Sequence, residues 1–263
     1  MSNIENNATL LQLNKEAQVA ALKAIGFNDA AVDMSLSEIA DYMRWAGGLR
    51  DLSIAVVGKT DGTVRCFTPE EWDALSATAK SENLRIGVRV RAEKQSFLIG
   101  KSDAPCCTDG SLTYRWAEEG ADVTGLKTYG AGSKGLYDDF DAKGMTDTVL
   151  AFAENRGKAY YVAQSAREYK ALDVNVDGAE DPVEWSAPTA AHMLILSRYR
   201  TQINDFINTY LGTSYALQST YYWAINECNA VNAWRIHLGS GSFRDGYKYN
   251  SSFTHRVRAV SAI

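Results

Sequence analysis

The chain has 263 residues, of which 46% are hydrophobic and 22% are charged, and it carries a formal net charge of −5 at pH 7. This composition is typical of a folded globular protein and excludes the disordered and fibrous classes. No apolar run approaches the roughly 18 residues of a membrane helix, so we expect no membrane insertion. The acidic balance excludes an electrostatic nucleic-acid binder, because phosphate contacts need clustered Lys and Arg.

The beginning of the chain predicts a small α+β module. Apolar residues recur at helical spacing over 12–26 and 35–46, which predicts two helices. The period changes to that of a strand at 52–57, and an Asp-Gly turn connects this strand to a return strand at 64–67. We interpret residues 1–95 as an attachment or oligomerisation module, because they contain neither a catalytic cluster nor a phosphate-binding loop.

A capping motif marks the next helix. Thr68 is the cap, Pro69 takes the first helical position and Glu71 follows three residues after the cap, so a helix is predicted to run to about residue 80. Alternating apolar residues at 86–90 and an apolar run at 96–99 predict two more strands.

The remaining elements are less regular. Residues 102–145 lack periodicity and are rich in Gly, Asp and Ser, which is typical of loops. A short helix is predicted at 146–155 and a short strand at 159–163. The clearest helical period covers 189–210, and short strands joined by glycine turns follow at 221–260.

The cysteines and histidines do not form a metal or disulfide pattern. Cys106 and Cys107 are adjacent, the other two cysteines lie far from them, and the three histidines are scattered singly. Residues 1–7 lack the basic and apolar regions of a signal peptide, so we expect synthesis in a cytosol and reduced thiols.

An acidic segment at 173–184 fits the pattern of a calcium-binding loop. Carboxylate and amide oxygens at these spacings are suitable calcium ligands. Glu180 replaces the usual apolar residue and Pro182 obstructs an exiting helix, so a polar surface turn is the alternative. No cofactor is expected to be required, and calcium is the candidate. The candidate ligands are Asp173, Asn175, Asp177 and Glu184.

The C-terminal segment combines a buried strand face with a polar surface. Trp234, Ile236 and Leu238 alternate with polar residues, as in a strand with one exposed face. The following residues are rich in Tyr, Asn, Ser, Arg and Gly, which antibody paratopes favour because they give contact area and adaptable hydrogen bonds. Tyr247 and Tyr249 are predicted contact residues, with burial in the core as the alternative.

Segments 141–147, 185–193 and 257–260, together with Tyr222-Trp223, resemble C-type-lectin-fold domains related to formylglycine-generating enzyme. They are most similar to the variable proteins of diversity-generating retroelements and to ligand-binding domains of bacteriophages. The resemblance covers roughly residues 96–263. It implies a scaffold of Trp223, Trp234, Gly241, Lys248, Val257 and Arg258. It also implies a ligand-binding set of Asn226, Asn229, Asn232, Arg235, His237, Ser240, Ser242, Arg244, Asp245, Tyr247, Tyr249 and Asn250, with Cys228 and Val231 among the exposed positions.

The fold class expected is therefore α+β, with a C-terminal C-type-lectin fold after the N-terminal module. The resemblance implies a non-enzymatic, receptor-binding bacteriophage protein, located in the virion and assembled in the host cytoplasm. Its expected partners are a host cell-surface receptor, protein or glycan, other virion proteins and further copies of itself. The alternatives are a purely structural virion protein of a head fibre, neck or tail and, less favoured because only Cys228 occupies the C-terminal part, a formylglycine-generating-type oxidase.

Overall fold

The computed structural model describes residues 16–17, 48–92, 95–130 and 133–262. The helices predicted at 12–26 and 35–46 lie outside the described residues, apart from 16–17, which are helical. Contacts group Leu52–Val90 with Ser96–Ile263 in one compact unit, and the other described residues belong to a second unit, in which Arg91 pairs with Asp51 at 2.8 Å.

One sheet of the structure has five strands in the order β2-β1-β3-β4-β8. Ile54, Ile86 and Ile99 at its centre are fully buried. The β1–β2 hairpin confirms the predicted strands and turn, with Val57 opposite Val64. The boundary predicted near residue 95 falls between β3 and β4, which are neighbours in this sheet. The strands are β1 (Leu49–Gly58), β2 (Val64–Phe67), β3 (Asn83–Ala92), β4 (Gln95–Gly100) and β8 (Val260–Ala262).

The capping motif at Thr68 forms as predicted. Its hydroxyl accepts a hydrogen bond from Glu71 N (3.2 Å), and its own N–H donates to the Glu71 carboxylate (2.8 Å). The helix is shorter than predicted, because Ser76 caps a separate helix by accepting from Ala79 N (3.2 Å). The two helices are α3 (Pro69–Ala74) and α4 (Ala77–Ser81).

Helix α5 (Ala142–Arg156) extends the predicted helix toward the N-terminus, where Asp141 accepts from Gly144 N at 2.8 Å. The strand predicted at 159–163 is wrong. That segment enters α6 (Tyr161–Glu168), and its small and apolar residues are buried at helical spacing, at Val162, Ala163, Ser165 and Ala166.

The long helix predicted at 189–210 is divided at Tyr199, whose backbone (φ −106°, ψ 19°) is not helical. Helix α8 (Ala190–Arg198) packs against a second sheet, and α9 (Arg200–Tyr210) packs against the 3₁₀ turn η2 (Thr213–Tyr215). The other short elements are η1 (Lys134–Tyr137) and α7 (Val174–Asp177).

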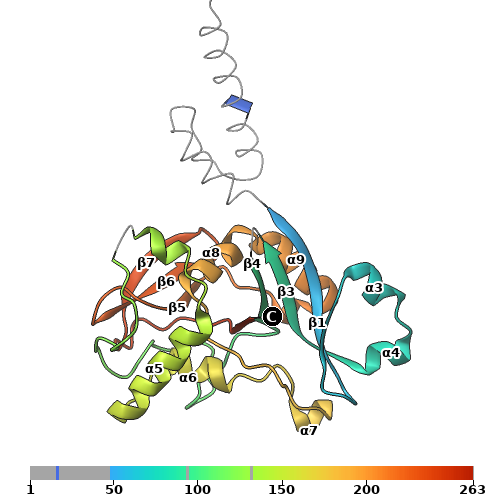
Figure 1. Cartoon of the computed structure of the whole chain (residues 1–263), viewed down its shortest axis with the longest axis horizontal. Coiled ribbons are helices and arrows are strands. Elements are labelled where there is room, and N and C mark those ends of the chain that lie inside the picture. Colours follow the sequence, from blue (N-terminus) through green and yellow to red (C-terminus); the bar gives the residue numbers. More distant parts are fainter. Residues whose placement is uncertain (1–15, 18–47, 93–94, 131–132, 263) are drawn as a thin grey trace, which may run out of the picture. The chain divides into compact units, whose positions relative to one another are not determined.

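The second sheet has three antiparallel strands in the order β5-β6-β7, namely β5 (Tyr221–Glu227), β6 (Asn232–His237) and β7 (Ser242–Tyr247) (Figure 1). Three tryptophans tie the irregular loops to this sheet. Trp116 Nε1 donates to Ala224 O (2.9 Å), Trp223 Nε1 to Tyr114 O (2.8 Å), and Trp234 Nε1 to Tyr129 O (2.8 Å). Helices together with two separate antiparallel sheets confirm the α+β class.

Candidate functional site

A continuous row of aromatic rings and one guanidinium group crosses the three-stranded sheet and the segment after β7. We call this row the aromatic strip. Tyr247 and Tyr249 are the most exposed members, at 46% and 43% of their surface, and the others are half-buried. The aromatic strip consists of His237, Tyr221, Arg235, Phe253, Tyr247 and Tyr249.

The members contact one another in that order. The rings of His237 and Tyr221 lie 5.0 Å apart, and the Arg235 guanidinium lies 4.5 Å from the Tyr221 ring and 4.7 Å from the Phe253 ring. Phe253 is 5.7 Å from Tyr247, which is 6.5 Å from Tyr249. Stacked and edge-on rings at these separations attract one another, so the row holds its own arrangement.

Strand pairing explains how the first members meet. Tyr221 lies opposite His237, and Trp223 lies opposite Arg235, so all four side chains point to the same side of the sheet. Gly246 on β7 allows the side chains of Trp223 and Arg235 to pack against its backbone, because a Cβ there would lie 2.9 Å from Trp223 and 3.1 Å from Arg235.

Arg235 is held firmly at the centre of the aromatic strip. Its Nε donates to Asp245 O (3.1 Å) and its Nη1 donates to His255 Nε2 (2.9 Å). Burial, and then the Arg235 charge, lowers the pKa of His255 to about 4, so His255 is a neutral acceptor. Burial also lowers the pKa of Arg235 itself. The guanidinium group is therefore partly desolvated, between two rings and a neutral imidazole.

A buried ion pair fixes the two exposed tyrosines. Lys248, between Tyr247 and Tyr249, has no exposed surface, and its ammonium pairs with the equally buried carboxylate of Glu227. The ammonium also donates to the carbonyls of Ala121 (2.8 Å) and Ala230 (3.0 Å). Burial lowers the pKa of Lys248 and raises that of Glu227, and the attraction between the charges opposes both shifts. Because Lys248 turns inward, its neighbours turn outward.

The structure places most of the predicted ligand-binding residues on β6, β7 and their turns. Those most exposed to solvent are Asn229, Ser240, Arg244, Asp245, Tyr247 and Tyr249, and those partly exposed are Asn232, Arg235, His237, Ser242 and Asn250. Asn229 and Asn250 accept hydrogen bonds from backbone N–H groups of their own turns, so they also shape these turns.

The prediction for Asn226 is wrong. Its side chain is fully buried, accepts from Ala190 N (2.7 Å) and donates to the Met145 sulfur (3.4 Å). It therefore satisfies an N–H at the start of α8 instead of facing a ligand. Every residue from 222 to 227 is buried, so this strand does not show the alternation that marks an exposed face.

Sequence reasoning missed three residues around Arg235. Tyr221 begins a strand that is otherwise buried on both sides, so alternation does not reveal it, and only its pairing with His237 brings it to the aromatic strip. Phe253 and His255 reach the aromatic strip through an irregular turn, so no periodic signal points to them.

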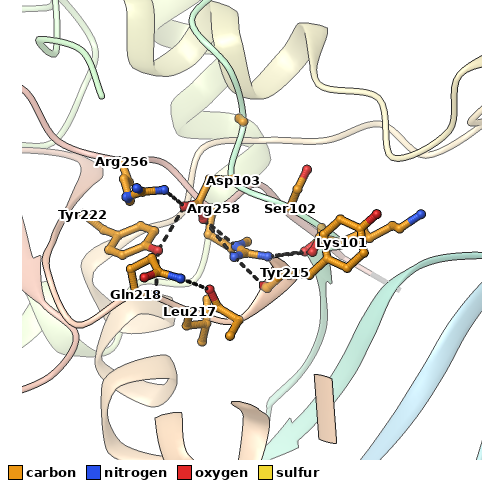
Figure 2. A network of polar contacts seen from close by, with 12 residues as sticks. Lys101, Ser102, Asp103, Tyr215, Leu217, Gln218, Tyr222, Arg256 and Arg258 are labelled. Atoms are coloured by element: carbon orange, nitrogen blue, oxygen red, sulfur yellow. Dashed lines mark hydrogen bonds and ion pairs between the residues drawn. The ribbon is translucent and has the colours of Figure 1, made fainter. Parts of the chain in front are cut away.

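A second polar cluster surrounds Asp103, at a pocket of about 210 Å³ (Figure 2). Asp103 accepts from Arg256 (2.7 Å), Arg258 (2.9 Å) and the Tyr222 hydroxyl (3.2 Å). Arg258 is buried and also donates to three backbone carbonyls, so all of its nitrogens have partners. Burial and the Asp103 charge raise the pKa of Tyr222 to about 12. We assign this cluster to the scaffold, because Asp103 bridges the two arginines and the buried Arg258 is fully hydrogen-bonded.

The four predicted calcium ligands do not form one cluster. Glu184 pairs with Arg167 (2.6 Å) and Lys143 (3.1 Å). Asp173 accepts from Asn175 N (2.9 Å), and Asp177 accepts from Asp173 N (2.8 Å), within a single turn. Over the described part of the chain, no group of three or more His, Cys, Asp or Glu side chains is placed to hold a metal ion.

No family model matches the chain, and no curated protein matches it. Among solved structures it is similar to a fimbrial protein from Bacteroides ovatus ATCC 8483, with 13% sequence identity and a TM-score of 0.48. The match covers 80% of this chain and 48% of that protein, so the chain spans about half of its length. None of the helices in the described ranges has the length and apolar character to cross a membrane.

Proposed function

We propose that this chain is a non-enzymatic receptor-binding protein and that the aromatic strip is its ligand-binding surface. The observation that carries the proposal is the exposure of Tyr247 and Tyr249 on a rigid support. An exposed aromatic residue leaves apolar surface in water, which is unfavourable in free energy, and a contiguous group of such residues marks an interaction site. Tyrosine is also enriched among residues that dominate binding energy.

The resemblance in sequence extends this proposal to the setting. We propose a C-type-lectin fold for residues 96–263 and a place in a bacteriophage virion, with a host cell-surface receptor, other virion proteins and further copies of the chain as partners. The burial of Trp223, Trp234, Lys248, Val257 and Arg258 supports the division into scaffold and contact residues. Burial also raises the pKa of Cys228, which disfavours a reactive thiolate there and so gives the oxidase alternative no support.

The experiment compares fluorescently labelled protein with its Tyr247→Ala, Tyr249→Ala double variant on a panel of bacterial strains. We expect the double variant to lose binding with only a small change in melting temperature, since both side chains are exposed to solvent over almost half of their surface. Val176→Ala is the control, because Val176 is 80% exposed and lies in α7, outside the aromatic strip.

Three outcomes would contradict the proposal. If the double variant binds as well as the parent, or if no strain binds the parent, the aromatic strip does not bind a cell-surface receptor. If the double substitution instead dissociates an oligomer that the parent forms, and no cell binding is seen, the aromatic strip is a packing surface, as the structural alternative requires.

A further inference from the structure

We propose that the ligand of the aromatic strip is an acidic saccharide, with its carboxylate held by Arg235 and Arg244 and its sugar rings packed along the aromatic strip. This inference rests on the proposed function and adds the chemical class of the ligand.

The first argument is a pair of like charges that the fold brings together. Arg235 on β6 lies directly opposite Arg244 on β7, so both side chains leave the same side of the sheet. Like charges in this position destabilise a sheet. Within the described ranges, neither arginine has a carboxylate at ion-pair distance, whereas Arg156, Arg167 and Arg256 each have one.

The surroundings of Arg235 sharpen the argument. Its nearest acidic neighbour in sequence and strand pairing, Asp245, points its carboxylate to the amide of Asn232 (3.0 Å). Burial lowers the pKa of Arg235, Arg244 adds to this effect, and Tyr221 and Asp245 oppose it. An incoming carboxylate would compensate for the lost hydration of Arg235 and offset its repulsion by Arg244, and guanidinium groups bind carboxylates with two parallel hydrogen bonds.

The shape of the site favours a saccharide over other anions. The rings lie in a row across a sheet, and no member of the aromatic strip lines the pocket of about 210 Å³ at Asp103. Peptide anchors need hollows for their side chains, whereas the C–H face of a sugar ring packs on an exposed aromatic ring and its hydroxyls reach polar groups such as His237 and Ser242. Two arginines in a chain of net charge −5 are too few for a nucleic-acid backbone.

The test uses matched pairs of probes that differ in one charge. Binding of trigalacturonic acid and its methyl ester, and of sialyllactose and lactose, is measured by isothermal titration at low and high salt. We expect at least one acid to bind roughly tenfold more tightly than its neutral partner, which corresponds to about 1.4 kcal/mol, and we expect this preference to weaken in salt.

Arg244→Gln is the informative variant. Arg244 is exposed, so its replacement leaves the fold intact, and we expect the variant to lose most of the preference for the acid while it keeps the binding of the neutral sugar. Lys170→Gln, which removes an exposed cation beyond the end of α6, is the matched control and should change nothing.

The outcomes separate this inference from the proposed function. Equal binding of acid and neutral sugars, a preference that Arg244→Gln does not reduce, or tighter binding of polyglutamate or oligo-dT would overturn the acidic saccharide. So would the absence of sugar binding, and the proposed function would still stand if cell binding depends on Tyr247 and Tyr249. If cell binding is independent of these tyrosines and no sugar binds, both fail.

Discussion

Lys248→Met is the change that should couple folding to the binding surface most directly. The methionine fills the space of the lysine stem but leaves the Glu227 carboxylate buried without its cation, and it leaves the carbonyls of Ala121 and Ala230 without a donor. Breaking a buried ion pair by removing one partner costs about 3–5 kcal/mol. That is a large part of the 5–15 kcal/mol or so that stabilises a typical domain.

The assay is urea unfolding followed by tryptophan fluorescence. Lys143→Met is the matched control, because the pair of Lys143 with Asp147 has the ordinary distance of 2.8 Å but lies at the surface, and we expect it to cost less than about 1 kcal/mol. Val123 N also donates to the Glu227 carboxylate (3.2 Å). The double variant Lys248→Met, Glu227→Gln removes both charges and keeps an acceptor for this N–H, so it should recover at least about 1 kcal/mol of the loss.

Two results would refute this reasoning. A loss of less than about 1 kcal/mol in Lys248→Met would show that the ammonium is not a buried partner of Glu227. A double variant as unstable as the sum of the two single variants would show that the two groups do not interact.

Three further predictions concern Asn226, two histidines and the acidic segment at 173–184. Asn226→Ala should lower the free energy of unfolding by about 1–3 kcal/mol, since it leaves a buried N–H unsatisfied, without changing cell binding; loss of binding at unchanged stability would return Asn226 to the ligand face. Burial lowers the pKa of His192 to about 3 and that of His255 to about 4, from an ordinary 6.5. The unfolded chain therefore binds protons that the folded chain does not, so the stability from these histidines is greatest above pH 6.5 and falls between pH 6.5 and about 3. Equilibrium unfolding at several pH values should show this fall. If the difference in unfolding free energy between the parent and the His192→Gln, His255→Gln variant does not change with pH, the reasoning is contradicted. Calcium should not raise the melting temperature, because Glu184 is already paired with Arg167, and a calcium-dependent rise lost in Glu184→Gln would restore the metal site.

Sequence reasoning succeeded where a structure depends on neighbouring residues. The cap at Thr68 and the turn between β1 and β2 are local hydrogen-bond patterns, and the alternation from 234 to 238 reflects one strand with two different sides. The segment 159–163 shows the limit of such reasoning. Short runs of small and apolar residues fit a strand or a buried helix equally well, and packing decides between them.

The features that escaped prediction depend on contacts between distant parts of the chain. β8 joins the first sheet by pairing with β4, which lies some 160 residues earlier in sequence, as in the pair Ile99–Val260. Asn226 was misplaced because its strand is buried on both sides, so its polar side chain carries no sign of which partner it meets. Phe253 and His255 belong to the site only because a turn folds them back onto Arg235.

Under the proposed function, the segment 247–249 separates the residues that stabilise the fold from those that contact the ligand. Lys248 makes all of its hydrogen bonds inward, to a carboxylate and two carbonyls of the scaffold, and has no exposed surface. Tyr247 and Tyr249 contribute ring contacts at 5.7 Å and 6.5 Å and leave almost half of their surface in water. Substitutions at exposed positions usually change stability by less than about 0.5 kcal/mol. We therefore expect exchanges of the two tyrosines to cost little stability, as long as the lysine between them keeps the backbone in place.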